Sequence, residues 1–276
     1  MEKLRIDSTV ILNNNVPIPL LGFGVYEIPA GKPTYDAVTA ALQTGYRHID
    51  TAHIYGNEAD VGKAVLESGI PRKDIFVTTK LWNKDQGYDS VLKAFELSLK
   101  ELGLDYVDLY LIHFPVEKRR LISWRAMEKI YEQKRARAIG VSNFTVLHLR
   151  EFLDHSSITP VVNQVELSPF LYQRDLLVFC RKQNIEVEAY SPLTKGTRLK
   201  DPALMKLAAR HGKTTAQILI RWALEHGLIV LPKSSHSDRI VENADVFDFS
   251  INPEDMRTLN SVSENYRTCW DPTDVP

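Results

Sequence analysis

Cysteine is scarce in this chain, which has only Cys180 and Cys269 among its 276 residues. A secreted protein of this size that relied on disulfides would carry more, so we expect a reducing, cytoplasmic setting. The two cysteines are not spaced like the ligands of a metal, and we expect no metal site.

Long apolar runs are also missing, since no segment approaches the roughly 18 apolar residues that span a bilayer. The first ten residues, MEKLRIDSTV, lack the apolar core of a secretory signal peptide. Neither sign of charge is in excess: 34 Lys and Arg face 35 Asp and Glu, which gives a formal net charge of −1. Nucleic-acid and membrane-surface binding usually need a basic excess, so we expect neither.

No linker or low-complexity segment interrupts the chain, and we predict one domain over residues 1–276 and a monomer.

The opening segment predicts a β-hairpin. Thr9–Leu12 is β-prone, Asn13–Asn15 supplies a turn, and the extended pattern resumes at Val16.

Eight short β-rich runs then alternate with helical patterns. The predicted strands are Leu20–Tyr26, Arg47–Asp50, Ile75–Lys80, Tyr106–His113, Ala138–Ser142, Val161–Glu166, Ile185–Tyr190 and Leu228–Pro232. The clearest helices are predicted at 57–68, 89–103, 121–133 and 214–227. Gly103 and Gly227 mark the ends of the second and the fourth of these helices.

This alternation indicates parallel strands with crossover helices, and about eight units predict a (β/α)8 TIM barrel with an N-terminal β-hairpin. The alternative is an open doubly wound sheet, which usually carries a glycine-rich phosphate loop after its first strand. Here the first strand runs through Gly22 and Gly24 but lacks a third glycine at the required spacing. We therefore favour the barrel.

Polar residues end nearly every predicted strand, where barrel enzymes place their active sites. They are Tyr26, Asp50, Lys80, His113, Ser142 with Asn143, Asn163 with Gln164, Tyr190 with Ser191, and Lys233 with Ser234. Helix caps would explain one or two of these residues. A full ring of them suggests a functional site.

Four residues suit the protonation of a carbonyl oxygen. The phenol of Tyr55 has an ordinary pKa of about 10, which a neighbouring Lys80 ammonium would lower. Asp50 would hold the lysine in place, and His113 would orient the carbonyl. The accompanying hydride requires a nicotinamide, because no side chain supplies one. Singly, these residues also fit a structural ion pair or a core histidine; together they favour a site.

Seven separated motifs then resemble the aldo-keto reductase superfamily, in the family's order and over nearly the whole chain. They are GYRHIDTAHIYGNEADVGKAV (45–65), TTKLWN (78–83), LYLIHFP (109–115), IGVSNF (139–144), VVNQVELSPF (161–170), EAYSPL (188–193) and LPKSSHSDRIVEN (231–243). The resemblance implies NADPH-dependent reduction of an aldehyde or ketone, with Tyr55 as general acid, Lys80 and Asp50 tuning it, and His113 positioning the carbonyl.

The resemblance also implies the binding residues for NADPH/NADP+. Ser142, Asn143 and Gln164 would hold the nicotinamide carboxamide, Tyr190 would stack on its ring, and Ser191 and Leu193 would follow the pyrophosphate. Lys233, Ser234 and Arg239 would grip the 2′-phosphate, and Asn243 would contact the adenine. Ser235 and Ser237 are candidate caps for a helix there. Tyr26, Trp82, Phe114 and His113 would form the substrate mouth.

Only Val116–Arg120 separates the His113 motif from the next helix, whereas larger family members have a long loop there. This chain therefore resembles the short microbial type, such as diketogluconate and glyoxal reductases, and a short rim favours small carbonyls over steroids or prostaglandins. Two other classes stay open: a barrel lyase that uses Lys80 for Schiff-base chemistry, and a non-enzymatic cofactor sensor or channel-associated subunit.

Overall fold

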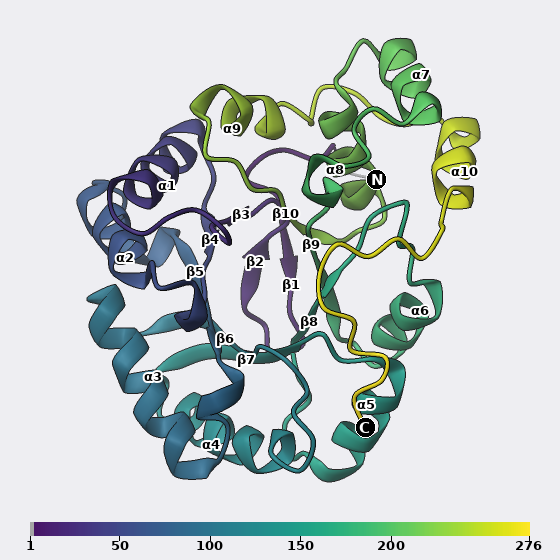
Figure 1. The fold of residues 1–276 in the computed structure, drawn as a ribbon. Helices are drawn as coiled ribbons and strands as arrows, with labels where there is room; N and C mark the ends of the chain where they lie inside the picture. The colour runs from purple at the N-terminus through teal and green to yellow at the C-terminus, as the bar shows by residue number, and fades with distance from the viewer. Residues whose placement is uncertain (1–2) are drawn as a thin grey trace.

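The computed structural model describes residues 3–276, and its centre is a ring of eight parallel strands (Figure 1). The strands are β3 (Phe23–Gly24), β4 (His48–Asp50), β5 (Phe76–Leu81), β6 (Val107–Ile112), β7 (Ala136–Ser142), β8 (Val162–Glu166), β9 (Glu186–Tyr190) and β10 (Ile229–Leu231). Each strand pairs with the next in chain order, and each overlaps one of the eight predicted runs.

The sheet closes on itself between its first and last strands. Leu21 forms a parallel bridge with Val230. The N–H of Gly22 donates to the carbonyl of Val230 at 2.9 Å, and the N–H of Val230 donates to the carbonyl of Leu20 at 2.8 Å. The predicted (β/α)8 barrel is therefore confirmed, and the doubly wound alternative is excluded because that sheet stays open.

A two-stranded hairpin precedes the barrel, as predicted. It pairs β1 (Thr9–Ile11) with β2 (Pro17–Pro19), and its turn places Asn15 at a φ of 66°, which asparagine tolerates better than most residues. Asn14 donates from Nδ2 to the carbonyl of Arg137, the second residue of β7, at 3.0 Å. The hairpin thus lies across the amino-terminal end of the barrel, away from the carboxyl ends of the strands (Figure 1).

Helices surround the ring of strands (Figure 1). They are α1 (Lys32–Thr44), α2 (Glu58–Glu67), α3 (Tyr88–Leu102), α4 (Arg120–Glu132), α5 (Val146–His155), α6 (Arg174–Lys182), α7 (Pro202–His211), α8 (Thr215–Glu225), α9 (Ser237–Ala244) and α10 (Pro253–Ser261). The four helices predicted with bounds correspond to α2, α3, α4 and α8. Over residues 3–276, none of these helices has the length and apolar character needed to cross a membrane.

Local chemistry explains two of the predicted helix ends and corrects a third. Thr214 caps α8, with its side chain accepting from the N–H of Gln217, and Gly103 ends α3 at a φ of 64°. The predicted serine caps of α9 are wrong, because its N-cap is His236 and no side chain caps it. The nearby N–H of His236 donates instead to Ser234 Oγ at 3.1 Å, a local turn outside the helix.

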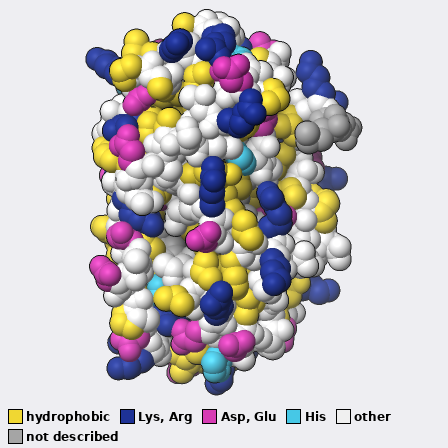
Figure 2. Space-filling view, turned by 90° about the vertical axis from the view of Figure 1, so that its right-hand side faces the viewer, with side chains coloured by type: hydrophobic (Ala, Val, Ile, Leu, Met, Phe, Trp, Pro, Cys, Tyr) yellow, Lys and Arg dark blue, Asp and Glu magenta, His cyan; other side chains and the backbone are white. Residues whose placement is uncertain are grey.

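The segment after α10 passes across the barrel near β8 and β9 and ends close to α5, in yellow in Figure 1. Its attachment to the barrel is polar. Glu166 accepts from the backbone N–H of Thr268 at 2.7 Å and of Cys269 at 3.0 Å. On the face that carries α6 and α10, basic and acidic side chains are interspersed with hydrophobic ones (Figure 2).

Candidate active site

A cavity of about 730 Å³ lies at the carboxyl ends of the barrel strands. Most of the predicted site residues line it: Tyr26, Asp50, Tyr55, Trp82, His113, Ser142, Asn143, Gln164, Tyr190, Ser191, Leu193 and Lys233. The other predicted residues lie outside this lining: Lys80, Phe114, Ser234, Arg239 and Asn243. Residues far apart in the sequence therefore meet here because parallel strands end at one rim.

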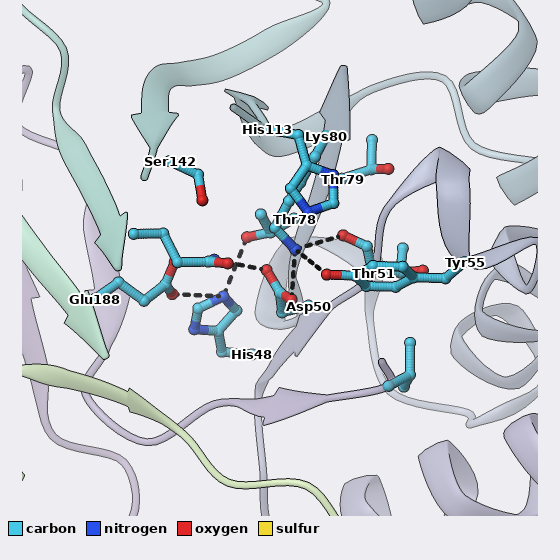
Figure 3. A network of polar contacts seen from close by, with 12 residues as sticks. His48, Asp50, Thr51, Tyr55, Thr78, Thr79, Lys80, His113, Ser142 and Glu188 are labelled. Carbon is cyan, nitrogen blue, oxygen red and sulfur yellow. Dashed lines mark hydrogen bonds and ion pairs between the residues drawn. The ribbon is translucent and has the colours of Figure 1, made fainter. Parts of the chain in front are cut away.

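Lys80 lies directly beneath the cavity on β5 and is fully buried. Its Nζ donates to Asp50 Oδ1 at 2.6 Å and to the carbonyl of Thr51 at 2.8 Å, and it lies 3.5 Å from the hydroxyl of Tyr55 (Figure 3). An ammonium has three N–H donors, and each one here has an oxygen to meet. The arrangement fits a charged lysine that faces a phenol.

Tyr55 ends the short 3-10 helix η1 (His53–Tyr55), which follows β4. Burial raises the pKa of its phenol well above the usual 10, and the charge of Asp50 raises it further. The sequence predicted a lowered pKa beside Lys80, whereas the net shift is upward, because the loss of solvent is the largest cause. Tyr55 is fully protonated near neutral pH and is available as a proton donor.

His113 follows β6 and faces Tyr55, with 5.6 Å between the two ring centroids. Burial lowers the pKa of His113 well below 6.5, and the positive charge of Lys80 lowers it further. The imidazole is therefore neutral at pH 7 and carries one N–H. A neutral histidine beside a phenol supplies a second donor for the same oxygen atom of a ligand.

On the opposite wall, hydrogen bonds order the amide of Asn143. Its Nδ2 donates to the carbonyl of His113 at 2.9 Å and to Ser142 Oγ at 3.0 Å, while its Oδ1 accepts from the hydroxyl of Tyr190 at 2.8 Å. Asn143 has a φ of 64°, a conformation that asparagine adopts more readily than bulkier residues. This wall presents oriented polar groups beside the ring of Tyr190.

At the far end of the cavity, Lys233 donates to the carbonyl of Glu27 at 3.3 Å. Burial and the neighbouring Lys195 lower the pKa of Lys233. Ser234 and Asn243 are buried behind it, and Arg239 is exposed on α9. Lys233 thus lines the cavity, whereas the other three residues lie outside its lining.

Aromatic rings form the rim. Trp82 lies 5.5 Å from Trp270 and 5.4 Å from His113, measured between ring centroids. Phe114 is outside the lining but packs edge-on against Trp270 at 6.4 Å. Tyr26 packs against Tyr55 at 4.9 Å. Of the predicted substrate-mouth residues, Tyr26, Trp82 and His113 therefore line one opening, and Phe114 lies outside it.

Several residues of the site escaped sequence reasoning. Cys269 and Lys195 line the cavity, and the acid Glu188 and His48 lie beneath it. Strand alternation carried a signal for the last two. His48 is two residues before Asp50, and Glu188 is two before Tyr190, so each shares the inward face of its strand with a predicted site residue.

The carboxyl end of this closed parallel barrel thus brings a phenol, a buried lysine and a neutral imidazole together around one cavity. The chain belongs to the Aldo/keto reductase family, whose pattern matches residues 21–264. The family is one of oxidoreductases, so the chain is an aldo-keto reductase by descent.

Named relatives agree along nearly their full lengths. The chain is 48% identical over 268 residues to a 9,11-endoperoxide prostaglandin H2 reductase of Trypanosoma cruzi, covering 96% of this chain and 95% of the relative. It is 46% identical over 270 residues to a glyoxal reductase of Bacillus subtilis, covering 98% of each. The predicted likeness to short microbial members is confirmed.

Solved structures share the fold. MGS-M4, an aldo-keto reductase enzyme from a Medee basin deep-sea metagenome library, matches with a TM-score of 0.94 and 47% identity, over 98% of this chain and all of that one. An aldo-keto reductase of Bombyx mori, solved in complex with NADP, matches with a TM-score of 0.89 and 37% identity, over 96% and 95% of the two chains.

Proposed function

We propose that this protein reduces small aldehydes and ketones to alcohols with NADPH. The observation that carries the proposal is the position of the Tyr55 hydroxyl, which lines the cavity 3.5 Å from the buried Nζ of Lys80 and beside a neutral His113. A carbonyl oxygen placed between the phenol and the imidazole would meet two donors.

Tyr55 supplies the proton. Hydride addition to a carbonyl carbon turns the oxygen into an alkoxide, which is a much stronger base than a phenolate, so the phenol protonates it even with a raised pKa. The O–H bond of Tyr55 breaks, the new O–H bond completes the alcohol, and the negative charge moves to the phenolate. Lys80 stabilises that charge. Because the charge is absent before the reaction, this interaction stabilises the transition state more than the bound substrate and so lowers the barrier.

The residues present suit a nicotinamide dinucleotide, which supplies the hydride when it is bound. Both N–H bonds of the Gln164 amide point to carboxyl groups, to Asp50 Oδ2 at 2.9 Å and to Glu188 Oε2 at 2.5 Å. Its carbonyl oxygen is thereby left to accept from a carboxamide, beside the oriented Ser142 and Asn143. At the other end Lys233, Ser234 and Arg239 would meet the 2′-phosphate, and the NADP complex of the Bombyx mori relative supports this choice.

The Schiff-base alternative requires an unprotonated Lys80 that reaches the substrate. The lysine is instead buried, outside the cavity lining, and paired with Asp50 at 2.6 Å. These contacts favour a charged lysine that acts through Tyr55 over a nucleophile. A sensor or channel-associated subunit would need no such donor set.

The aromatic rim of Tyr26, Trp82 and Trp270 favours small carbonyls. The name of the Bacillus subtilis relative supports dicarbonyl substrates of this size, whereas the Trypanosoma cruzi relative is named for a prostaglandin endoperoxide. The test is a panel of methylglyoxal, glyceraldehyde, nitrobenzaldehyde, keto-sugars and a steroid ketone, followed by loss of NADPH absorbance. We expect turnover with the small aldehydes. Absence of NADPH oxidation across the panel would overturn the proposal, and a steroid preference would overturn the substrate class.

A further inference from the structure

The barrel contains a second buried acid immediately beneath the site. Glu188 lies on β9 with an exposed fraction of 0%, and its Oε2 accepts from Gln164 Nε2 at 2.5 Å. On the other side, its Oε1 lies 3.5 Å from Nε2 of His48 (Figure 3). Glu188 does not line the cavity and is too deep to touch a ligand. A buried carboxyl with no part in proton transfer calls for another role.

The geometry of Gln164 indicates that role. The last side-chain torsion of a glutamine is broad, so a single hydrogen bond leaves the plane of the amide free to turn. Here Asp50 takes one N–H and Glu188 takes the other. Two acceptors for one nitrogen fix the plane of the Gln164 amide. They also fix which end of the amide faces the acids, since the amide oxygen would be repelled by the Asp50 carboxylate.

We propose that Glu188 is a positioning residue for cofactor binding: with Asp50 it holds the Gln164 amide so that its carbonyl oxygen faces the cavity as an acceptor for the nicotinamide carboxamide. The proposal rests on the proposed function, because it needs a nicotinamide at this wall. It adds to that function a residue that acts only through Gln164.

The protonation of the cluster is consistent with this role. Burial raises the pKa of Glu188 to about 8, and the charge of Asp50 contributes to the shift. Burial also lowers the pKa of His48 to about 3, so its contact with Glu188 is not an ion pair. Near pH 7 Glu188 is thus a neutral acid whose Oε2 still accepts from Gln164. A neutral acceptor orients the amide without placing a second negative charge beside Asp50.

Two variants of Glu188 distinguish the loss of its hydrogen-bond acceptor from the loss of its side-chain volume. Glu188→Gln keeps an oxygen that can accept from Gln164, whereas Glu188→Met keeps the length of the side chain and removes that acceptor. Binding is measured by quenching of protein fluorescence, with NADPH and with 2′-phospho-ADP-ribose, which has the same phosphates and adenine but no nicotinamide. Glu188→Leu provides the same comparison if Glu188→Met lowers the melting temperature.

We expect Glu188→Met to weaken NADPH binding by about 3- to 10-fold, the usual range for one hydrogen bond. Glu188→Gln should bind NADPH like the unchanged protein, and 2′-phospho-ADP-ribose should bind all three alike. In a Gln164→Leu background, Glu188→Met should have no further effect, because its partner is gone.

Equal losses for NADPH and for 2′-phospho-ADP-ribose would overturn the inference, since they would indicate general damage to the fold. Unchanged NADPH binding in Glu188→Met, or a further loss in the Gln164→Leu background, would overturn it as well. These outcomes leave the proposed function standing if the unchanged protein still oxidises NADPH with aldehydes. Failure of the unchanged protein to bind NADPH would overturn both.

Discussion

Glu166 at the end of β8 accepts a hydrogen bond from the backbone N–H of Cys269, 103 positions further along the chain, at 3.0 Å. The same carboxylate also accepts from Oγ1 of Thr268 at 2.6 Å. Because Trp270 follows directly and packs on Trp82, this one buried acid ties the C-terminal segment to the rim of the cavity.

The first prediction concerns that tether. Glu166→Ala removes the carboxylate that accepts three hydrogen bonds from residues 268 and 269, so Trp270 should lose its fixed place over the rim. We expect KM for small aldehydes to rise by about 3- to 30-fold, because only part of the lost hydrogen-bond energy, about 1–2 kcal/mol, should reach the substrate through Trp270, with a smaller change in kcat. Thr268→Val, which removes only the side-chain bond, is the matched control and should have a milder effect. A fall in kcat at unchanged KM would contradict this role.

The second prediction concerns the proton donor. Tyr55→Phe keeps the ring and its packing against Tyr26 but removes the O–H. Turnover should fall by about 100- to 10,000-fold, the range for general acid catalysis, while NADPH binding changes little. Steady-state kinetics and a fluorescence titration measure the two quantities. Near-normal turnover would exclude Tyr55 as the acid.

The third prediction separates Lys80 from its partner. Lys80→Met leaves the Tyr55 phenolate without the cation that stabilises it, so reduction should be crippled between pH 6 and pH 8. Asp50→Asn should do less harm, because the ammonium keeps its bonds to Thr51 and Tyr55. Parallel measurement of kcat in the two variants makes the comparison. Equal activity of Lys80→Met and the unchanged protein would refute the proton-transfer scheme.

Much of this architecture could be predicted from local pattern. The alternation of β-rich and helical runs predicted all eight barrel strands, and Asn13–Asn15 predicted the hairpin turn. The ends of the strands then predicted which side chains meet, because a parallel barrel brings those ends to one rim. The cavity is lined by Asp50, His113 and Gln164, although Asp50 and Gln164 are 114 residues apart in the sequence.

Features that depend on long-range contact could not be predicted in this way. Nothing near Cys269 in the sequence indicates that Glu166 holds it. The depth of burial decides the direction in which the pKa of Tyr55 shifts, and it is a property of the whole fold. The neighbouring lysine in the sequence pattern therefore did not predict that direction. The predicted serine caps of α9 failed because the helix begins at Ser237, which puts His236 at the N-cap position and leaves Ser235 before it.

The fourth prediction tests the cofactor preference at Arg239, which lies outside the cavity lining. Arg239 is exposed on α9, where a 2′-phosphate would take charge-assisted bonds from it. Arg239→Ala should weaken NADPH binding by about 5- to 100-fold and barely change NADH binding. Turnover at saturating NADPH should fall far less than in Tyr55→Phe, because Arg239 is remote from the reacting atoms. Equal losses for the two cofactors would mean that Arg239 does not recognise the 2′-phosphate.

The fifth prediction is a dependence of stability on pH that originates at Glu188. The groups around this carboxyl are His48 and Asp50 on β4, Lys80 on β5 and the uncharged Gln164 on β8. Its pKa is about 8 in the folded protein against 4.5 for an exposed glutamate. Between those values the unfolded chain has released a proton that the native protein keeps, so this residue makes the native state less stable as pH rises.

The cost is therefore absent below about pH 4.5, grows as pH rises and is complete above about pH 8, where it is on the order of a few kcal/mol. Glu188→Gln removes the titration, so its gain in stability over the unchanged protein should be small at pH 5 and largest near pH 8.5. Urea unfolding at both pH values measures this difference. His48 titrates in both proteins and cancels in the comparison, provided that its surroundings are kept. A gain that is the same at pH 5 and pH 8.5 would show that Glu188 is already ionised in the folded barrel.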